Sequence, residues 1–418
     1  MKSPRSYLLL LIIAFVHYRG FAQNNSSPYS ILGIGDIEES HFNRVSGMAN
    51  TGIAYRSSGY LINNNPAAYS ELSDQIFFVE AAARASFISY YGTAITSEND
   101  QTRDFAIERF SLGIRVNKFW GSSVGFMPYS TANYSFTGLK SIQGSNISTP
   151  ADYEGNGGVN QFYWGNGFKI TKHFSIGVNL AYLNGTLSQK ETIGSTSVSN
   201  QVVTTKDVYL RNFYPSYGMQ FYHKLNSKWD FGIGATYAYK KDLKAEYTST
   251  VTNGTNTTIS DNVTKDDYFT LPNTTGVGIA LTKNKKTTFV ADYRYQAWSD
   301  LNYKGFNYYL QNSSRLSAGI EISKKKQGYQ NTVETVFYQA GLFYSNSYLN
   351  VNNEQLKDMG FSIGMGFNSK RNALGYCFAF EYGIRGTQNS GLIQEKYGRL
   401  TITLSYRDFW LTKGRKYY

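Results

Sequence analysis

Few side chains of this 418-residue sequence are of the types that carry out enzymatic chemistry. Beyond the N-terminal leader the histidines are His41, His173 and His223, and the single cysteine is Cys377. His173 lies in a short turn and His223 beside one, which is a poor position for a buried catalytic base. Neither an HExxH nor a GxSxG motif is present. The sequence therefore predicts no enzyme and no cofactor or metal site, and one cysteine cannot form an intramolecular disulfide.

The charged residues that could do chemistry are arginines and carboxylates in stretches where apolar and small polar residues alternate. If the apolar face points outward, these charges point into the interior of a barrel, where an unpaired charge is costly. The first interpretation is that they pair and pin an internal segment to the wall. The alternative is that one or two arginines line a ligand path and meet a ligand carboxylate. The set comprises Glu80, Arg84, Arg109, Arg115, Asp292, Arg294, Glu321, Glu381 and Arg385.

The elements that must position these residues are long alternating strands. In WDFGIGATYAY (229–239) one face is aromatic and aliphatic, while the other carries glycine, threonine and aspartate. Many such stretches reach about ten residues, which suits a tilted membrane-spanning strand better than the strands of a soluble sandwich. The sequence predicts an all-β, 14-stranded antiparallel transmembrane β-barrel. Its strands centre near residues 82, 111, 128, 163, 178, 217, 235, 277, 293, 318, 340, 363, 379 and 404.

The connections between these strands alternate between short and long, which is typical of outer-membrane barrels. The short ones are at 117–122, 171–173, 225–228, 282–286, 323–328 and 368–372. The long ones fall near 92–103, 138–152, 188–206, 244–267, 300–312, 346–357 and 386–393.

Basic residues gather in the short turns, among them Lys118, Lys172, Lys224, Lys285, Lys325 and Arg371. They are either solvated turn residues or a ring that contacts phosphate headgroups of the inner leaflet. Loss of the three basic residues of the leader lowers the formal net charge from +12 to +9. Nucleic acid is not an expected partner of an exported barrel.

The N-terminus reads as a secretory signal. Lys2 and Arg5 precede the apolar run Leu8–Val16, and Gly20-Phe21-Ala22 forms a small-x-small cleavage site. The expected organisation is a signal peptide at 1–22, an N-terminal segment at 23–74 and a barrel with a short C-terminal tail at 75–418.

The segment before the first strand resembles a known family. SGMANTGIAYR (46–56) followed by Asn65-Pro66-Ala67 in NNNPAAYSEL is similar to the N-terminal hatch of the FadL/TodX family of outer-membrane transporters of hydrophobic compounds. The opening SPYSILGIGD (27–36) resembles Bacteroidota-type members. The resemblance implies that residues 23–74 fold as a plug in the lumen, where Asn and Pro supply turns and side-chain-to-backbone bonds. The alternative is a disordered periplasmic leader.

The resemblance also implies a ligand route. In this family a kink in the third strand opens the wall sideways and releases apolar ligand into the bilayer. Pro128, in FMPY (126–129), could produce that kink because proline lacks a ladder donor. The alternative is a proline near the end of a strand, where it does no harm.

The expected extracellular loops depart from the family's apolar pattern. The loops near 188–206 and 244–267 are rich in Ser, Thr and Asn and offer little surface to an acyl chain. The aromatic loop is NYKGFNYYL (302–310), with Tyr303, Phe306, Tyr308 and Tyr309. These side chains could contact a ligand, a partner protein or lipopolysaccharide.

Two functions follow from the sequence. The first is an outer-membrane channel or transporter for small hydrophobic compounds with lateral release. The alternative is a barrel scaffold subunit of a Bacteroidota outer-membrane protein-export or barrel-assembly complex. The expected partners are outer-membrane lipids and lipopolysaccharide, a hydrophobic small molecule in the first case and other proteins in the second.

Overall fold

The computed structural model describes residues 27–74, 76–92, 95, 100–141, 148–194, 201–305, 308–327, 332–369 and 373–409. The expected signal peptide, residues 23–26, Phe306 and the C-terminal tail lie outside these ranges. No helix in the described ranges has the length and apolar character that crossing a membrane requires.

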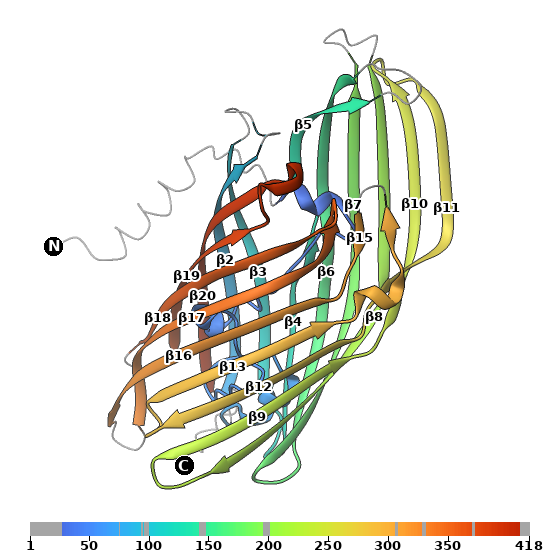
Figure 1. Ribbon diagram of the computed structural model, residues 1–418. Coiled ribbons are helices and arrows are strands. Elements are labelled where there is room, and N and C mark those ends of the chain that lie inside the picture. The colour runs from blue at the N-terminus through green and yellow to red at the C-terminus, as the bar shows by residue number, and fades with distance from the viewer. Residues whose placement is uncertain are drawn as a thin grey trace, which may run out of the picture.

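A single antiparallel sheet closes on itself to form the barrel, as predicted (Figure 1). Closure is made by β2 and β20, which pair from Ile76↔Phe409 to Tyr91↔Gln394. The wall has fourteen strands, three of which are interrupted, and each predicted strand centre falls in a different one. They are β2 (Ile76–Tyr91), β3 (Gln101–Arg115), β4 (Trp120–Thr131) continued by β5 (Tyr134–Ser141), β6 (Ser148–Lys169), β7 (Phe174–Ile193), β8 (Val202–Lys224), β9 (Trp229–Ala238) continued by β10 (Lys241–Asn253), β11 (Thr258–Leu271) continued by β12 (Thr274–Lys283), β13 (Thr287–Gln296), β16 (Ser313–Gln327), β17 (Thr332–Val351), β18 (Glu354–Asn368), β19 (Leu374–Arg385) and β20 (Gln394–Phe409).

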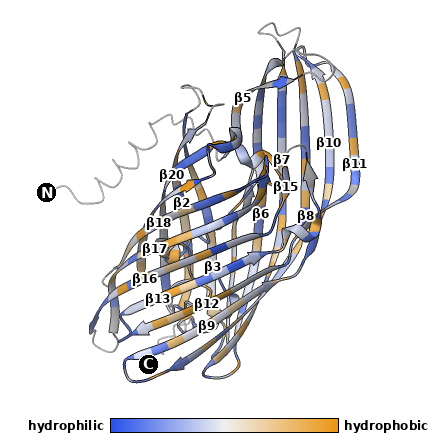
Figure 2. Cartoon of the chain, viewed as in Figure 1, coloured by the Kyte–Doolittle hydropathy of each residue, from blue (hydrophilic) through white to orange (hydrophobic). Residues whose placement is uncertain are grey.

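The two faces of the wall follow the predicted alternation, which Figure 2 shows as changes of colour along each strand. Apolar residues such as Ile233, Tyr237 and Leu342 are exposed on the outer face. Glycines stand opposite them, because backbone of the N-terminal segment lies directly against the inner face. A Cβ on Gly234 would collide with the carbonyl oxygen of Ile53, so only glycine fits there.

Several of the predicted long loops are wrong, because they are mostly strand. The hairpins β5–β6, β7–β8 and β10–β11 extend the sheet far beyond the rest of the wall at one end (Figure 1). Runs rich in Thr, Val and Ser are good strand sequences, so polarity alone was a poor sign of a loop there. The predicted loop at 346–357 is a two-residue turn, in which Asn352 and Asn353 adopt φ of 52° and 64°.

The N-terminal segment contains 3₁₀ turns and one short strand: η1 (Pro28–Ile31), β1 (Asp36–Ile37), η2 (Arg44–Met48) and η3 (Pro66–Glu71). Its parts contact opposite sides of the wall. The turn η2 packs against β16 to β19, whereas η3 packs against β4, β6, β7 and β8. Residues 42–55 and 60–72 are largely buried. The segment therefore spans the interior between these two groups of strands.

Candidate functional site

The Asn65-Pro66-Ala67 motif begins η3 against the inner wall. The Asn65 side chain is fully buried, and its Oδ1 accepts the N–H of Ala67 at 3.0 Å. Its Nδ2 donates to the carbonyl oxygen of Ile53 at 2.9 Å and to that of Met219 in β8 at 3.1 Å. Pro66 occupies the first position of the turn, where no N–H is needed. Asn65 also donates to the carbonyl oxygen of Ala235 in β9 at 3.3 Å, and thus ties two parts of the segment to two wall strands.

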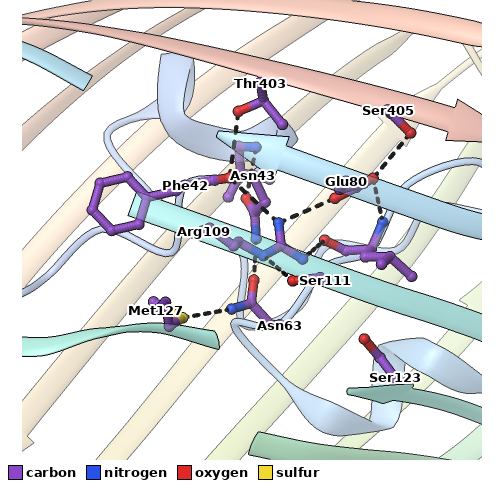
Figure 3. Close-up of polar contacts among 12 residues, drawn as sticks. Phe42, Asn43, Asn63, Glu80, Arg109, Ser111, Ser123, Met127, Thr403 and Ser405 are labelled. Carbon is purple, nitrogen blue, oxygen red and sulfur yellow. Dashed lines mark hydrogen bonds and ion pairs between the residues drawn. The ribbon is translucent and has the colours of Figure 1, made fainter. Parts of the chain in front are cut away.

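A buried ion pair between β2 and β3 also holds the segment (Figure 3). Arg109 in β3 and Glu80 in β2 are 3.1 Å apart, and each is 1% exposed. Glu80 accepts the N–H of Leu61 at 3.0 Å, while Arg109 donates to the carbonyl oxygens of Leu61 and Phe42, both at 3.3 Å. The pair therefore satisfies backbone groups of a segment that has no sheet of its own.

Arg44, at the start of η2, is held by two wall carboxylates. Its guanidinium donates to Glu321 at 2.8 and 2.9 Å and to Glu334 at 2.6 and 2.8 Å. The same guanidinium lies 3.9 Å from the ring centroid of Phe337. Tyr55 donates a further bond to Glu321 at 2.9 Å. This double bidentate contact is the strongest type of arginine–carboxylate interaction.

Around β1 the signs of charge are the reverse of those at Arg44. Three carboxylates lie on the segment, and the arginines lie on the wall. Each carboxylate lies close to one guanidinium of a different strand. The pairs are Asp36 with Arg385, Glu38 with Arg84 and Glu39 with Arg294, all at 2.7 Å. Arg84 also pairs with Glu108 of the wall at 2.7 Å.

The remaining predicted interior charges also contact the N-terminal segment, with one exception. Asp292 accepts the N–H groups of Gly52 and Ile53 at 2.7 and 2.9 Å. Arg115 pairs with Asp74 at 3.0 Å and donates to the carbonyl oxygen of Leu72 at 2.8 Å. The exception is Glu381, which pairs within the wall with Arg399 at 3.4 Å. The structure thus brings eight of the nine predicted residues into contact with the N-terminal segment.

These contacts fix the charge states of groups on the segment. Burial alone would raise the pKa of the Asp36 carboxyl, but the facing Arg385 holds it below its ordinary value. Burial likewise opposes the charge of Arg44, yet Glu321 and Glu334 raise its pKa well above the usual range. The pKa of His41 is lowered to about 3, mainly by burial and further by Arg294 and Arg109. At neutral pH Asp36 and Arg44 are therefore charged and His41 is neutral.

The wall is incompletely paired beside Pro128. The β3–β4 ladder ends at Phe110↔Phe126, and β3 continues to Gln101 with a partner only in β2. Between Pro128 and Ser130 the β4–β6 register shifts, as expected for a bulge. β6 pairs with one edge of Ser130 and Thr131, so β1 takes the other edge, which β3 has left. The seam between β3 and β4 is thus the place where the wall loses ladder bonds.

The aromatic loop at 302–310 folds back onto the barrel. Tyr303 stacks on Phe269 with 4.9 Å between ring centroids, and its hydroxyl accepts the N–H of Thr270 at 2.8 Å. Tyr308 pairs with Val351 and packs on the same apolar cluster, whereas Tyr309 is half-buried and pairs with Asn350. Two of these aromatic side chains are therefore partly buried and pack against the apolar cluster.

Two cavities lie next to the N-terminal segment. The first, of about 110 Å³, is lined by polar residues and by paired charges, such as Asp36 with Arg385 and Glu38 with Arg84. The second, of about 1150 Å³, opens at the short-turn end and is also mainly polar. In the described part of the chain, no group of three or more His, Cys, Asp and Glu side chains is arranged to hold a metal ion.

Several solved structures share this architecture. A Pseudomonas aeruginosa FadL homologue superposes with a TM-score of 0.62 at 12% identity, covering 90% of this chain and 100% of its own. The Pseudomonas putida toluene transporter TodX gives 0.59 at 16% identity, covering 91% and 99%. The Ralstonia pickettii toluene transporter TbuX gives 0.58 at 14% identity, covering 88% and 98%. No curated protein sequence matches this chain.

The molecule is thus a closed 14-stranded barrel with the fold of the FadL/TodX-type transporters. A family model described as BamG matches residues 5–417, which is nearly the whole chain. The chain belongs to the BamG family.

Replacing Arg44 with methionine tests the strongest of these contacts. Arg44→Met leaves Glu321 and Glu334 without their cation, and loss of one partner of a buried pair costs about 3–5 kcal/mol. We expect a lower unfolding temperature of the detergent-solubilised barrel and faster proteolysis within residues 43–72. Adding Glu321→Gln and Glu334→Gln should restore part of the loss.

The matched control is Lys265→Met, because Lys265 and Glu246 form an exposed pair at 3.9 Å. It should change stability by less than about 1 kcal/mol. Equal stability of Arg44→Met and Lys265→Met would contradict the assignment.

Proposed function

We propose that this chain is an outer-membrane barrel whose lumen is closed by residues 27–74 and which serves as a scaffold subunit of a protein-export or barrel-assembly complex. The observation that carries the proposal is the way in which the segment is fastened. Ion pairs and side-chain-to-backbone bonds join it to strands all around the wall. Such an interior suits a rigid scaffold subunit better than a channel through which a solute passes.

The rest of the interior supports a closed barrel. Its apolar part is filled by a packed cluster that includes the buried side chains of Phe42, Trp298 and Tyr348. The cavities beside the segment are lined mainly by charged and polar groups. An apolar solute gains little from entering such a space, because its transfer is favoured only by apolar surroundings.

The outer surface supports a membrane location. Large apolar side chains are exposed along the wall, among them Phe162, Leu342 and Ile363. A soluble monomer rarely exposes so much apolar surface, whereas the outer face of a membrane barrel requires it. The basic turns then lie at the periplasmic rim, and the extended β5–β6, β7–β8 and β10–β11 hairpins project from the cell as surfaces for partner proteins.

Gentle-detergent purification of the tagged full-length chain tests the scaffold. We expect another outer-membrane protein at a fixed stoichiometry, and slower appearance of folded barrel proteins or exported proteins when the chain is depleted. A monodisperse lone barrel, together with depletion that changes only the uptake of hydrophobic compounds, would contradict the proposal.

Transport of small hydrophobic compounds is the second candidate, and one observation favours it. The β3–β4 ladder ends beside Pro128, and the outward side chains of Phe105 and Ile107 there are 61% and 76% exposed. A gap in a membrane wall lets an apolar solute reach the bilayer without passing through water. The TodX and TbuX barrels of the same fold are toluene transporters.

The substitution Pro128→Val separates the two candidates. Valine supplies the missing N–H and is a good strand residue, so the seam should tighten while the barrel still folds. If toluene leaves the barrel there, its uptake by whole cells should fall several-fold. Pro215→Val is the matched control, because Pro215 lies in β8 opposite Leu180 and away from the seam.

Under the scaffold proposal, both proline variants keep their partners and neither changes toluene uptake. Slower uptake in Pro128→Val alone would establish the lateral route.

A further inference from the structure

The short-turn end of the barrel contains an open vestibule of about 1150 Å³. Its floor is formed by residues 55–60 of the N-terminal segment. Its wall includes Lys172 and His173 from one turn, Asn284–Lys286 from another, and the strand ends at Lys224 and Arg407. The cavity therefore lies inside the ring of basic turns and opens along the barrel axis.

Positive charge predominates in this vestibule. Three acidic residues line it, and two of them, Glu321 and Glu334, are already bound to Arg44. The basic side chains that line it number eight. They are Arg44, Arg56, Lys172, Lys224, Lys285, Lys286, Lys325 and Arg407. Even after the Arg44 pairs are set aside, the lysines around the mouth outnumber the one remaining carboxylate, Asp230.

Arg407 marks a built site within this positive region. Its side chain is 6% exposed, and its Nε has no hydrogen-bond partner among the described residues. The guanidinium lies 4.6 Å from the ring centroid of Tyr60 and donates to Asn368. In the described ranges it has no carboxylate within ion-pair distance. Burial of a guanidinium without an anion is costly. The other interior arginines that contact the N-terminal segment all have a carboxylate partner, so Arg407 differs from them.

We propose that the vestibule binds an acidic, carboxylate-rich extended segment of a periplasmic partner protein. The inference deepens the scaffold proposal and rests on it for the nature of the partner. Lys172, Lys224 and Lys285 come from different turns, so they can meet several carboxylates spaced along a peptide, with Arg407 at the inner end. Such complementarity determines specificity and speeds association.

The position of the vestibule disfavours a lipid headgroup. Acyl chains must stay in the bilayer outside the wall, whereas the cavity lies within the rim, and its floor is the N-terminal segment. A single phosphate would also leave the separated lysines without an anion. A peptide with several carboxylates along the barrel axis can enter the cavity inside the rim and can also pair with the separated lysines.

The test uses the full-length chain in a nonionic detergent and a fluorescein-labelled decaglutamate peptide, followed by fluorescence anisotropy at low salt. We expect saturable one-to-one binding. The combined variant Lys172→Glu, Lys224→Glu and Lys285→Glu should weaken it at least about tenfold, because the changes reverse charge at the mouth. Arg407→Gln, which keeps the lysines, should weaken it several-fold.

The matched control carries Lys190→Glu, Lys206→Glu and Lys265→Glu in the long hairpins at the other end, with the same change in net charge. It should bind within about twofold of the unmodified chain, since the mouth is unchanged. Heat-modified migration on gels verifies that every variant is folded.

Three results would overturn the inference. They are no saturable binding, equal weakening in the control, or displacement of the peptide by inorganic phosphate or anionic phospholipid vesicles but not by chloride of equal ionic strength. If the chain does not bind the peptide but still co-purifies with a partner protein, the scaffold proposal holds and only the inference about the vestibule is wrong.

Discussion

A segment that forms no sheet or long helix cannot satisfy its own backbone, yet residues 42–72 pass through the interior of a closed barrel. Every buried N–H and C=O there needs a partner, because an unmet buried group costs about 1–3 kcal/mol. The wall supplies those partners as side chains. Asp292 takes the amides of Gly52 and Ile53, and Glu80 takes that of Leu61. The remaining features of the interior follow from this requirement.

Charge on the wall has to be balanced by charge on the segment. Two parts of the segment provide this balance with opposite signs of charge. Arg44 enters between wall carboxylates, whereas Asp36 and Glu39 face wall arginines. Backbone also has to reach the wall closely, which explains the inward glycines such as Gly234. Arg407 in the vestibule does not follow this balance. We therefore infer that its anion comes from outside the chain.

Much of this architecture could be predicted from the sequence because a strand has a strict two-residue period. That period gave the fourteen strands, the inward face and the nine interior charges. The segment has no period, so the partners Asp36, Glu38 and Arg44 were missed, although unpaired wall charges of both signs implied that such partners exist. The long hairpins were also missed, because their Thr-rich strands are polar on both faces and resemble loops by composition.

The function depends on whether this interior stays closed. Hydrogen–deuterium exchange of the detergent-solubilised full-length chain tests this most directly. The fastening described above predicts that the amides of Gly52, Ile53 and Leu61 exchange as slowly as those of central wall strands, over hours. Exchange of these amides within seconds, as in a chain without hydrogen bonds, would contradict a segment that is held by the wall.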